Sequence, residues 1–209
     1  MFVTIAQGQK ILAQGGLLCF PTETFYALGC VAKNSKAVAA IYALKGRSRT
    51  KPLPLAAASI SQACANVYLA DIPPKLLDFW PGPVTILTTL QAKLEKSLAP
   101  ELINSLGQVA LRVSSHKTVQ ALAATDLLTV SSANLSGQAP VQRAANLSKE
   151  LLAALAQSNL PWGIVSALEE EAAYTLPSTL VRSSQAGLEI LRAGAVSKAA
   201  FEEKGLKVV

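Results

Sequence analysis

Short runs of Val, Ile and Leu alternate along this chain with longer, alanine-rich stretches, and this alternation constrains the fold most strongly. A short apolar run between turn residues is typical of a buried strand, and a longer stretch with one apolar stripe is typical of a helix. Strands are therefore predicted over residues 17–20, 53–57, 84–90, 109–113, 127–131, 163–167, 179–182 and 189–191. This alternation predicts an α/β protein, and the irregular connections favour a mixed sheet over a purely parallel one.

The helices are expected between these strands. Ser35 is predicted to cap a helix over residues 36–45, and Ser59 is predicted to cap a short helix that ends near residue 65. The other predicted helices cover residues 72–79, 117–124 and 144–157.

Composition places the chain among globular proteins. Hydrophobic residues make up 51% and charged residues 15%, so a sizeable core can form and intrinsic disorder is excluded. No linker or repeat divides the chain, which predicts one domain over residues 1–209. The longest apolar runs are too short to cross a bilayer, and no secretory signal begins the chain. The odd number of cysteines, three, without CxxC spacing, predicts no disulfide framework. Together these features lead us to expect a cytoplasmic protein without a membrane segment.

The common catalytic motifs are absent. The sequence has no GxxxxGK[ST], GxGxxG or GxSxG pattern. Its one histidine, His116, is more readily explained by a structural hydrogen bond near a helix start than by a Ser-His-Asp triad. Cys19 lies within an apolar run, which favours a core thiol over a nucleophile.

Basic residues gather at one point of a chain whose net charge is +6. Lys45, Arg47, Arg49 and Lys51 lie within seven residues, while acidic residues gather at 169–171. Cations can simply complement a helix dipole at its C-terminus. Because this run continues past Gly46 into a loop, a site for phosphate or carboxylate is favoured.

Polar side chains also follow several predicted strands. They lie in residues 22–24, in residues 131–137, at 177–179 and at Arg192. Each group could be an ordinary cap, turn or surface charge. Ligand crevices of α/β proteins form at strand ends, however, so together these groups indicate a polar pocket.

Taken in order, these segments resemble the YrdC-like family. The matching segments are residues 20–29, 44–47, 51–53, 80–85, 111–113 with His116, 132–137, 177–179 and 190–194. Each segment alone is weak evidence for the resemblance, but the whole set in this order, from about residue 15 to residue 196, is specific to the family. The resemblance implies a twisted mixed sheet with helices packed on it and a basic concave face.

The resemblance also implies an activity. Family members include synthases that form threonylcarbamoyl-AMP and pyrophosphate from L-threonine, bicarbonate and ATP, which are nucleotidyltransferases of tRNA threonylcarbamoyladenosine modification. ATP would be a substrate, Mg²⁺ would accompany its phosphates, and a tRNA threonylcarbamoyl transferase complex would take the product. Carboxylated threonine supplies its own anionic nucleophile, so no catalytic Ser or Cys is required.

Residue roles follow by motif. The family's KxR and SxN catalytic tetrad falls on Lys45, Arg47, Ser132 and Asn134. The residues that would bind ATP are Arg47, Lys51, Ser132 and Arg192. The residues that would bind threonine are Thr22, Thr24, Arg112 and Ser178.

The chain departs from the family pattern at Ala27, Ala56, Gln108, Arg182 and Ala193. These departures bear on substrate geometry and leave room for an alternative, a non-catalytic paralogue that binds double-stranded RNA or ribosomes. A third reading, carbamoyl-adenylate chemistry, is disfavoured because no acylphosphatase or zinc-finger segments are attached.

Overall fold

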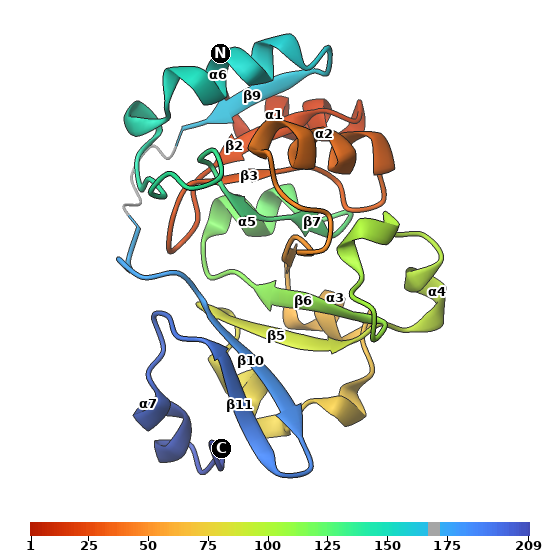
Figure 1. Cartoon of the computed structure of the whole chain (residues 1–209), viewed down its shortest axis with the longest axis vertical. Helices are drawn as coiled ribbons and strands as arrows, with labels where there is room; N and C mark the ends of the chain where they lie inside the picture. The colour runs from red at the N-terminus through yellow and green to blue at the C-terminus, as the bar shows by residue number, and fades with distance from the viewer. Residues whose placement is uncertain (167–171) are drawn as a thin grey trace.

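The fold is built around two mixed β-sheets in the computed structural model, which describes residues 1–166 and 172–209. Figure 1 shows the two sheets one above the other along the long axis of the molecule. The five-stranded sheet has the order β1 (Phe2–Val3), β9 (Trp162–Val165), β2 (Leu17–Phe20), β3 (Ala27–Gly29), β8 (Ser131–Ser132). The six-stranded sheet has the order β11 (Gly187–Arg192), β10 (Thr179–Ser184), β5 (Val84–Thr89), β6 (Gln108–Val113), β4 (Leu55–Ala57), β7 (Leu128–Thr129).

The prediction of a mixed sheet is confirmed, because parallel and antiparallel strand pairs occur together. The prediction of a single sheet is wrong, because there are two. The predicted strand 127–131 is split: β7 pairs with β4 in one sheet, and β8 pairs with β3 in the other. Val130 lies at the crossing, and its N–H donates to Pro54 O at 2.8 Å. An unbroken apolar run hides this change of sheet, because the pairing partners lie far away in the sequence.

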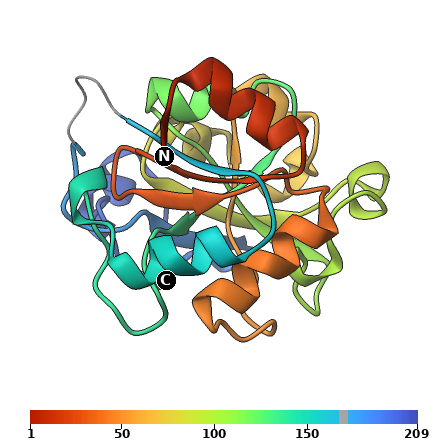
Figure 2. The same ribbon diagram turned by 90° about the horizontal axis from the view of Figure 1, so that it is seen from above.

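Helices cover both faces of the five-stranded sheet. Figure 2 shows α1 (Ile5–Ala13) on one face, and α2 (Ser35–Lys45) and α6 (Lys149–Gln157) on the other. α1 was not predicted, although Thr4 and Gln7 form a reciprocal capping box at its start. Because its strands are covered on both sides, β2 is buried at all four residues, as a continuous apolar run requires.

Smaller helices complete the fold. They are α3 (Ile60–Cys64), α4 (Ala92–Glu95), α5 (Lys117–Leu122), α7 (Lys198–Glu203) and the 3₁₀ helices Leu69–Asp71, Pro74–Phe79, Pro100–Leu102 and Ala144–Asn146. Neither α4 nor α7 was predicted. α7 packs against the 3₁₀ helix Pro74–Phe79, because the ring centroid of Phe201 lies 4.7 Å from that of Phe79.

Several predicted helix limits need correction. Asn34, not Ser35, caps α2, because its side chain accepts the N–H of Ala37 at 2.9 Å. Ser59 caps α3 as predicted. The predicted helix 144–157 is two elements, since Ser148 caps α6 at Lys149.

The segment predicted as a helix over residues 72–79 is instead the 3₁₀ helix Pro74–Phe79. The last residue of the predicted strand 163–167 and the acidic run 169–171 lie outside the described residues. Within the described ranges, no helix is long and apolar enough to span a bilayer.

Two of the three cysteines are core residues. Cys19 and Cys30 are fully buried, and burial raises the pKa of each thiol to about 12. Cys64, on α3, is half-buried. Because the thiolate is the reactive form, we expect iodoacetamide at pH 8 to modify one thiol of the native chain and all three after denaturation. Mass spectrometry would measure this, and rapid labelling of Cys19 in the native protein would contradict it.

Candidate active site

A pocket of about 400 Å³ is lined by residues from both sheets. Its walls come from the loop between β2 and β3, from β6 and β8, and from the ends of β10 and β11. It brings together seven of the ten residues predicted for the site: Thr22, Thr24, Arg47, Arg112, Ser132, Ser178 and Arg192. Lys45, Lys51 and Asn134 are not among its lining residues.

Three arginines converge on this pocket, and each is held differently. Arg47 donates from Nε to Lys51 O at 2.9 Å and from Nη2 to Pro52 O at 3.3 Å. Arg192 donates from Nη2 to Ser178 O at 2.7 Å and to Ser178 Oγ at 3.1 Å. Arg112 forms a buried ion pair with Glu23, with 3.3 Å between Nη1 and Oε1.

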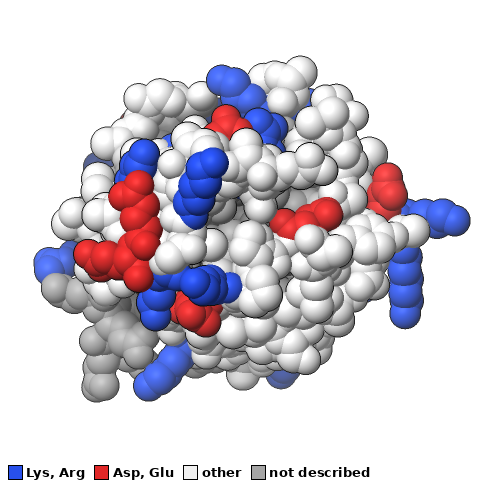
Figure 3. Space-filling model, turned by 90° about the horizontal axis from the view of Figure 1, so that it is seen from below, with Lys and Arg blue, Asp and Glu red and all other residues white. Residues whose placement is uncertain are grey.

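The three charges make the pocket electropositive. Burial, followed by repulsion from Arg112 and Arg47, lowers the pKa of Arg192. Burial is the main cause of this shift, and the repulsion adds to it because the three guanidinium groups share one pocket. By contrast, Figure 3 shows basic side chains interleaved with acidic ones on the lower face of the molecule. The pocket, rather than that face, is therefore suited to anions.

Two glycines shape the approach to this pocket. Gly46 ends α2 with a left-handed conformation, φ 57°, which favours glycine and turns the chain so that Arg47 lies at the pocket. At Gly194, a Cβ atom would lie 2.2 Å from Pro177 O. The absence of a side chain there lets the end of β11, with Arg192, approach Ser178.

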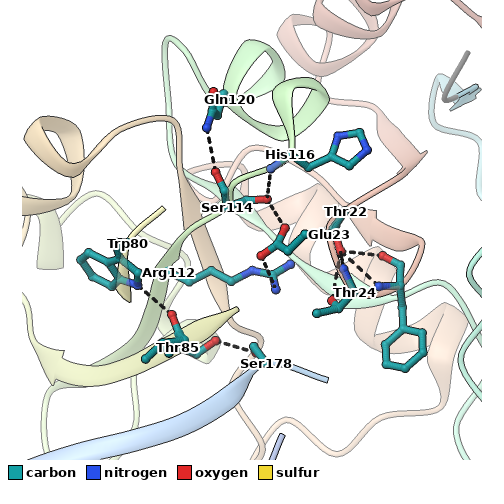
Figure 4. A network of polar contacts seen from close by, with 12 residues as sticks. Thr22, Glu23, Thr24, Trp80, Thr85, Arg112, Ser114, His116, Gln120 and Ser178 are labelled. Carbon is teal, nitrogen blue, oxygen red and sulfur yellow. Dashed lines mark hydrogen bonds and ion pairs between the residues drawn. The ribbon is translucent and has the colours of Figure 1, made fainter. Parts of the chain in front are cut away.

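Hydroxyl groups also line the wall of the pocket (Figure 4). Thr22 Oγ1 accepts the N–H groups of Thr24 and Phe25 at 3.1 and 3.2 Å, which fixes the loop after β2. Ser178 Oγ lies 2.8 Å from Thr85 Oγ1. These hydroxyls are preorganised donors and acceptors next to the arginines.

Lys45 is buried behind the pocket. Its Nζ donates to the carbonyl oxygens of Ser132 and Asn134, and Ser136 N donates back to Lys45 O at 3.1 Å. Burial, aided by the charge of Arg47, lowers the pKa of Lys45 from its ordinary value of 10.5 to about 8. The geometry makes Lys45 a clamp on the end of β8, which carries Ser132, and on the turn that follows it.

Asn134 and Lys51 also act on loops. Asn134 Nδ2 donates to Gln138 O at 2.6 Å and to Leu135 O at 3.1 Å, closing the turn after β8. Lys51 is exposed, and its carbonyl accepts from Arg47. Its side chain is not among those that line the pocket.

Sequence reasoning undervalued three residues. Thr85 lines the pocket, although sequence reasoning assigned its segment, residues 80–85, no role in the site. Glu23 and Ser114 are buried, and the Ser114 hydroxyl donates to Glu23 Oε2. The available signal was a carboxylate in a short polar segment directly after a buried strand.

His116 has the structural role predicted for it. It caps α5, and its Nδ1 accepts the N–H of Thr118 at 3.2 Å. Among the departures from the family pattern, Ala27 lines the pocket and Ala56 is fully buried in the core. Arg182 pairs with Glu189 at 2.6 Å and is not among the pocket-lining residues.

Known proteins resemble this chain over most of its length. A family model described as telomere recombination, covering the Sua5, YciO and YrdC proteins, matches residues 10–194. The chain is 37% identical over 151 residues to threonylcarbamoyl-AMP synthase of Bacillus subtilis (strain 168). The matched region covers 70% of this chain and 43% of that relative. The chain therefore spans less than half the length of this curated relative.

Solved structures show the same fold. Sua5 of P. abyssi, in complex with L-threonine, superposes with a TM-score of 0.81 at 23% identity, over 100% of this chain and 62% of that one. YciO of E. coli superposes with a TM-score of 0.72 at 18% identity, over 94% of this chain and 92% of that one. Fold and pocket together define an α/β protein with an electropositive ligand site. The chain belongs to the Sua5/YciO/YrdC family.

Proposed function

We propose that this chain is a nucleotidyltransferase that forms threonylcarbamoyl-AMP and pyrophosphate from L-threonine, bicarbonate and ATP. The observation that carries the proposal is the convergence of Arg47, Arg112 and Arg192 with several hydroxyls on one pocket. An amino-acid carboxylate and a triphosphate are two anions that such a site can hold together. The name of the B. subtilis relative and the threonine bound to P. abyssi Sua5 support this choice of substrates.

The chemistry asks the protein to position charges rather than to supply a nucleophile. The threonine amine takes up the carboxyl group of bicarbonate, with loss of water, to give a carbamate. A carbamate oxygen then forms a bond to the α-phosphorus of ATP, and the bond from that phosphorus to the bridging oxygen breaks to release pyrophosphate. Fixed guanidinium groups favour this step by stabilising the charge that develops on the phosphates.

Under this proposal, the two substrates bind neighbouring but different sets of residues in the pocket. Arg112 and Ser178, with the Thr22–Thr24 loop, bind threonine. Arg47, Arg192 and Ser132 bind ATP, and Lys51 guides the phosphates from outside. Lys45 and Asn134 act by holding the end of β8 and the turn after it in place, because their side chains bind backbone carbonyls.

A metal ion has no evident protein site. Among the described residues, no group of three or more His, Cys, Asp or Glu side chains is placed to hold one. Mg²⁺ would therefore arrive with the triphosphate as part of the substrate. We further propose a cytoplasmic enzyme whose product passes to a tRNA threonylcarbamoyl transferase complex. The RNA-binding alternative gains no support from the mixed charges of the lower face (Figure 3).

The direct test is pyrophosphate release. We expect release only when ATP, L-threonine and bicarbonate are all present, because the carbamate is the nucleophile. A coupled phosphate assay with pyrophosphatase, leaving out one substrate at a time, measures this dependence. Equal ATP turnover without threonine, or no turnover under any condition, would contradict the proposal.

A further inference from the structure

A buried carboxylate lies behind the pocket wall, and the proposed chemistry gives it no task. Glu23 is 4% exposed and is not among the pocket-lining residues. Its Oε1 lies 3.3 Å from Arg112 Nη1, and its Oε2 accepts the hydroxyl of Ser114 (Figure 4). A carboxylate this deeply buried is tolerated only with such partners.

The start of α5 holds this carboxylate in place. Ser114 Oγ accepts the N–H of His116 at 3.2 Å while it donates to Glu23. Gln120, one turn into α5, donates from Nε2 to Ser114 O at 3.0 Å. Ser114 is itself fully buried, so Glu23 is braced by a fixed hydrogen-bonded chain rather than by a mobile surface group.

Glu23 makes Arg112 different from the other two arginines of the pocket. Arg47 and Arg192 are held by neutral oxygens, whereas Arg112 is held by a full negative charge. Arg112 also lines the pocket, so the part of its guanidinium that does not face Glu23 is available to a ligand. Among the described pocket-lining residues there is no carboxylate, and Glu23 therefore lowers the positive charge at one corner only.

We infer that Glu23 is a positioning and specificity residue that reserves Arg112 for the carboxylate of the amino acid instead of the triphosphate. A guanidinium aligned from behind presents a fixed fork to a single carboxylate. Because Glu23 partly neutralises its charge, Arg112 attracts the highly charged phosphates less strongly than Arg47 and Arg192 do. The phosphates are therefore bound by Arg47 and Arg192. This inference rests on the proposed function and adds to it the means of separating the two anions.

The test is Glu23→Gln, which keeps the shape of the side chain and removes its charge. We expect the KM for L-threonine to rise about 10- to 100-fold, because Arg112 loses its alignment. The KM for ATP should change by less than about 3-fold, and kcat at saturating threonine should be retained within that range. A merely structural defect would instead raise the KM values for L-threonine and ATP together. An equal rise in both KM values would overturn the inference, and so would unchanged kinetics.

A matched control variant and a double-mutant cycle make the test more specific. Glu101→Gln removes another arginine-paired carboxylate, which lies 3.0 Å from Arg49 outside the pocket, and should leave both KM values unchanged. If Glu23 acts through Arg112, adding Glu23→Gln to Arg112→Met should not raise the threonine KM further. Additive losses in the double variant would overturn the inference.

Two measurements keep the test decisive. If Glu23→Gln does not fold, Ser114→Ala removes one brace of Glu23 and should raise the threonine KM by about 3-fold or more without changing the ATP KM. An unchanged threonine KM in folded Ser114→Ala would then overturn the inference. Failure of the wild-type protein to bind L-threonine by calorimetry would count against the proposed function itself. Normal threonine binding by Glu23→Gln would count against the inference alone.

Discussion

Arg47→Ala is expected to lower kcat/KM for pyrophosphate release by about 100-fold or more. Arg47 lines the pocket, and two of its donors are already fixed on Lys51 O and Pro52 O. The guanidinium is therefore held in one orientation before a ligand arrives, and preorganised cations of this kind contribute strongly to charge stabilisation. Steady-state kinetics with ATP as the varied substrate would measure the loss.

Arg47→Lys separates charge from shape. Lysine keeps the charge but cannot bind two carbonyls and a phosphate with one planar group, so an intermediate loss is expected. Arg182→Ala is the matched control, because Arg182 pairs with Glu189 and does not line the pocket. Near-normal activity in Arg47→Ala would remove this residue from the site and weaken the other roles assigned by the same motif.

Lys45→Met is expected to lower kcat/KM by about 100-fold, although Lys45 does not line the pocket. The change leaves the carbonyls of Ser132 and Asn134 without their buried donor, so the end of β8 and the turn after it are no longer held in position. A residue that acts only through loop position should leave the fold intact, which circular dichroism would check. Full activity in a folded Lys45→Met protein would contradict this account.

The pH dependence of stability gives a second readout of Lys45. Its folded-state pKa of about 8 lies below the ordinary value of 10.5, so the unfolded chain binds this proton more tightly. The cost of burying the charge is therefore fully present below pH 8 and disappears as the pH rises toward 10.5. The free energy of unfolding of the wild type, relative to Lys45→Met, should rise across this window in urea titrations. A flat difference would show that Lys45 is not buried as a charge.

Much of the fold was predictable from local pattern. The run at residues 17–20 became β2, and Ser59 capped α3, because burial and capping depend on side chains close together in the sequence. The polar segments at strand ends correctly indicated a pocket, and seven of ten predicted residues line it. Cys19 and His116 were also correctly assigned to structure, since an apolar run and a helix start are both local features.

The tertiary structure decided what depends on distant partners. It split the run at 127–131 between two sheets, because β4 and β3 compete for its two halves. It turned Lys45 from a presumed pocket residue into a clamp, since the carbonyls that it binds lie at Ser132 and Asn134. It also gave Glu23 a partner far away in the sequence, Arg112, across a 3.3 Å ion pair. The sequence by itself determined which side chains could bind an anion, because charge and hydrogen-bonding capacity belong to residue type. Only folding decided which of them face the ligand and which hold the others in place, because that depends on distances between segments that no local pattern encodes.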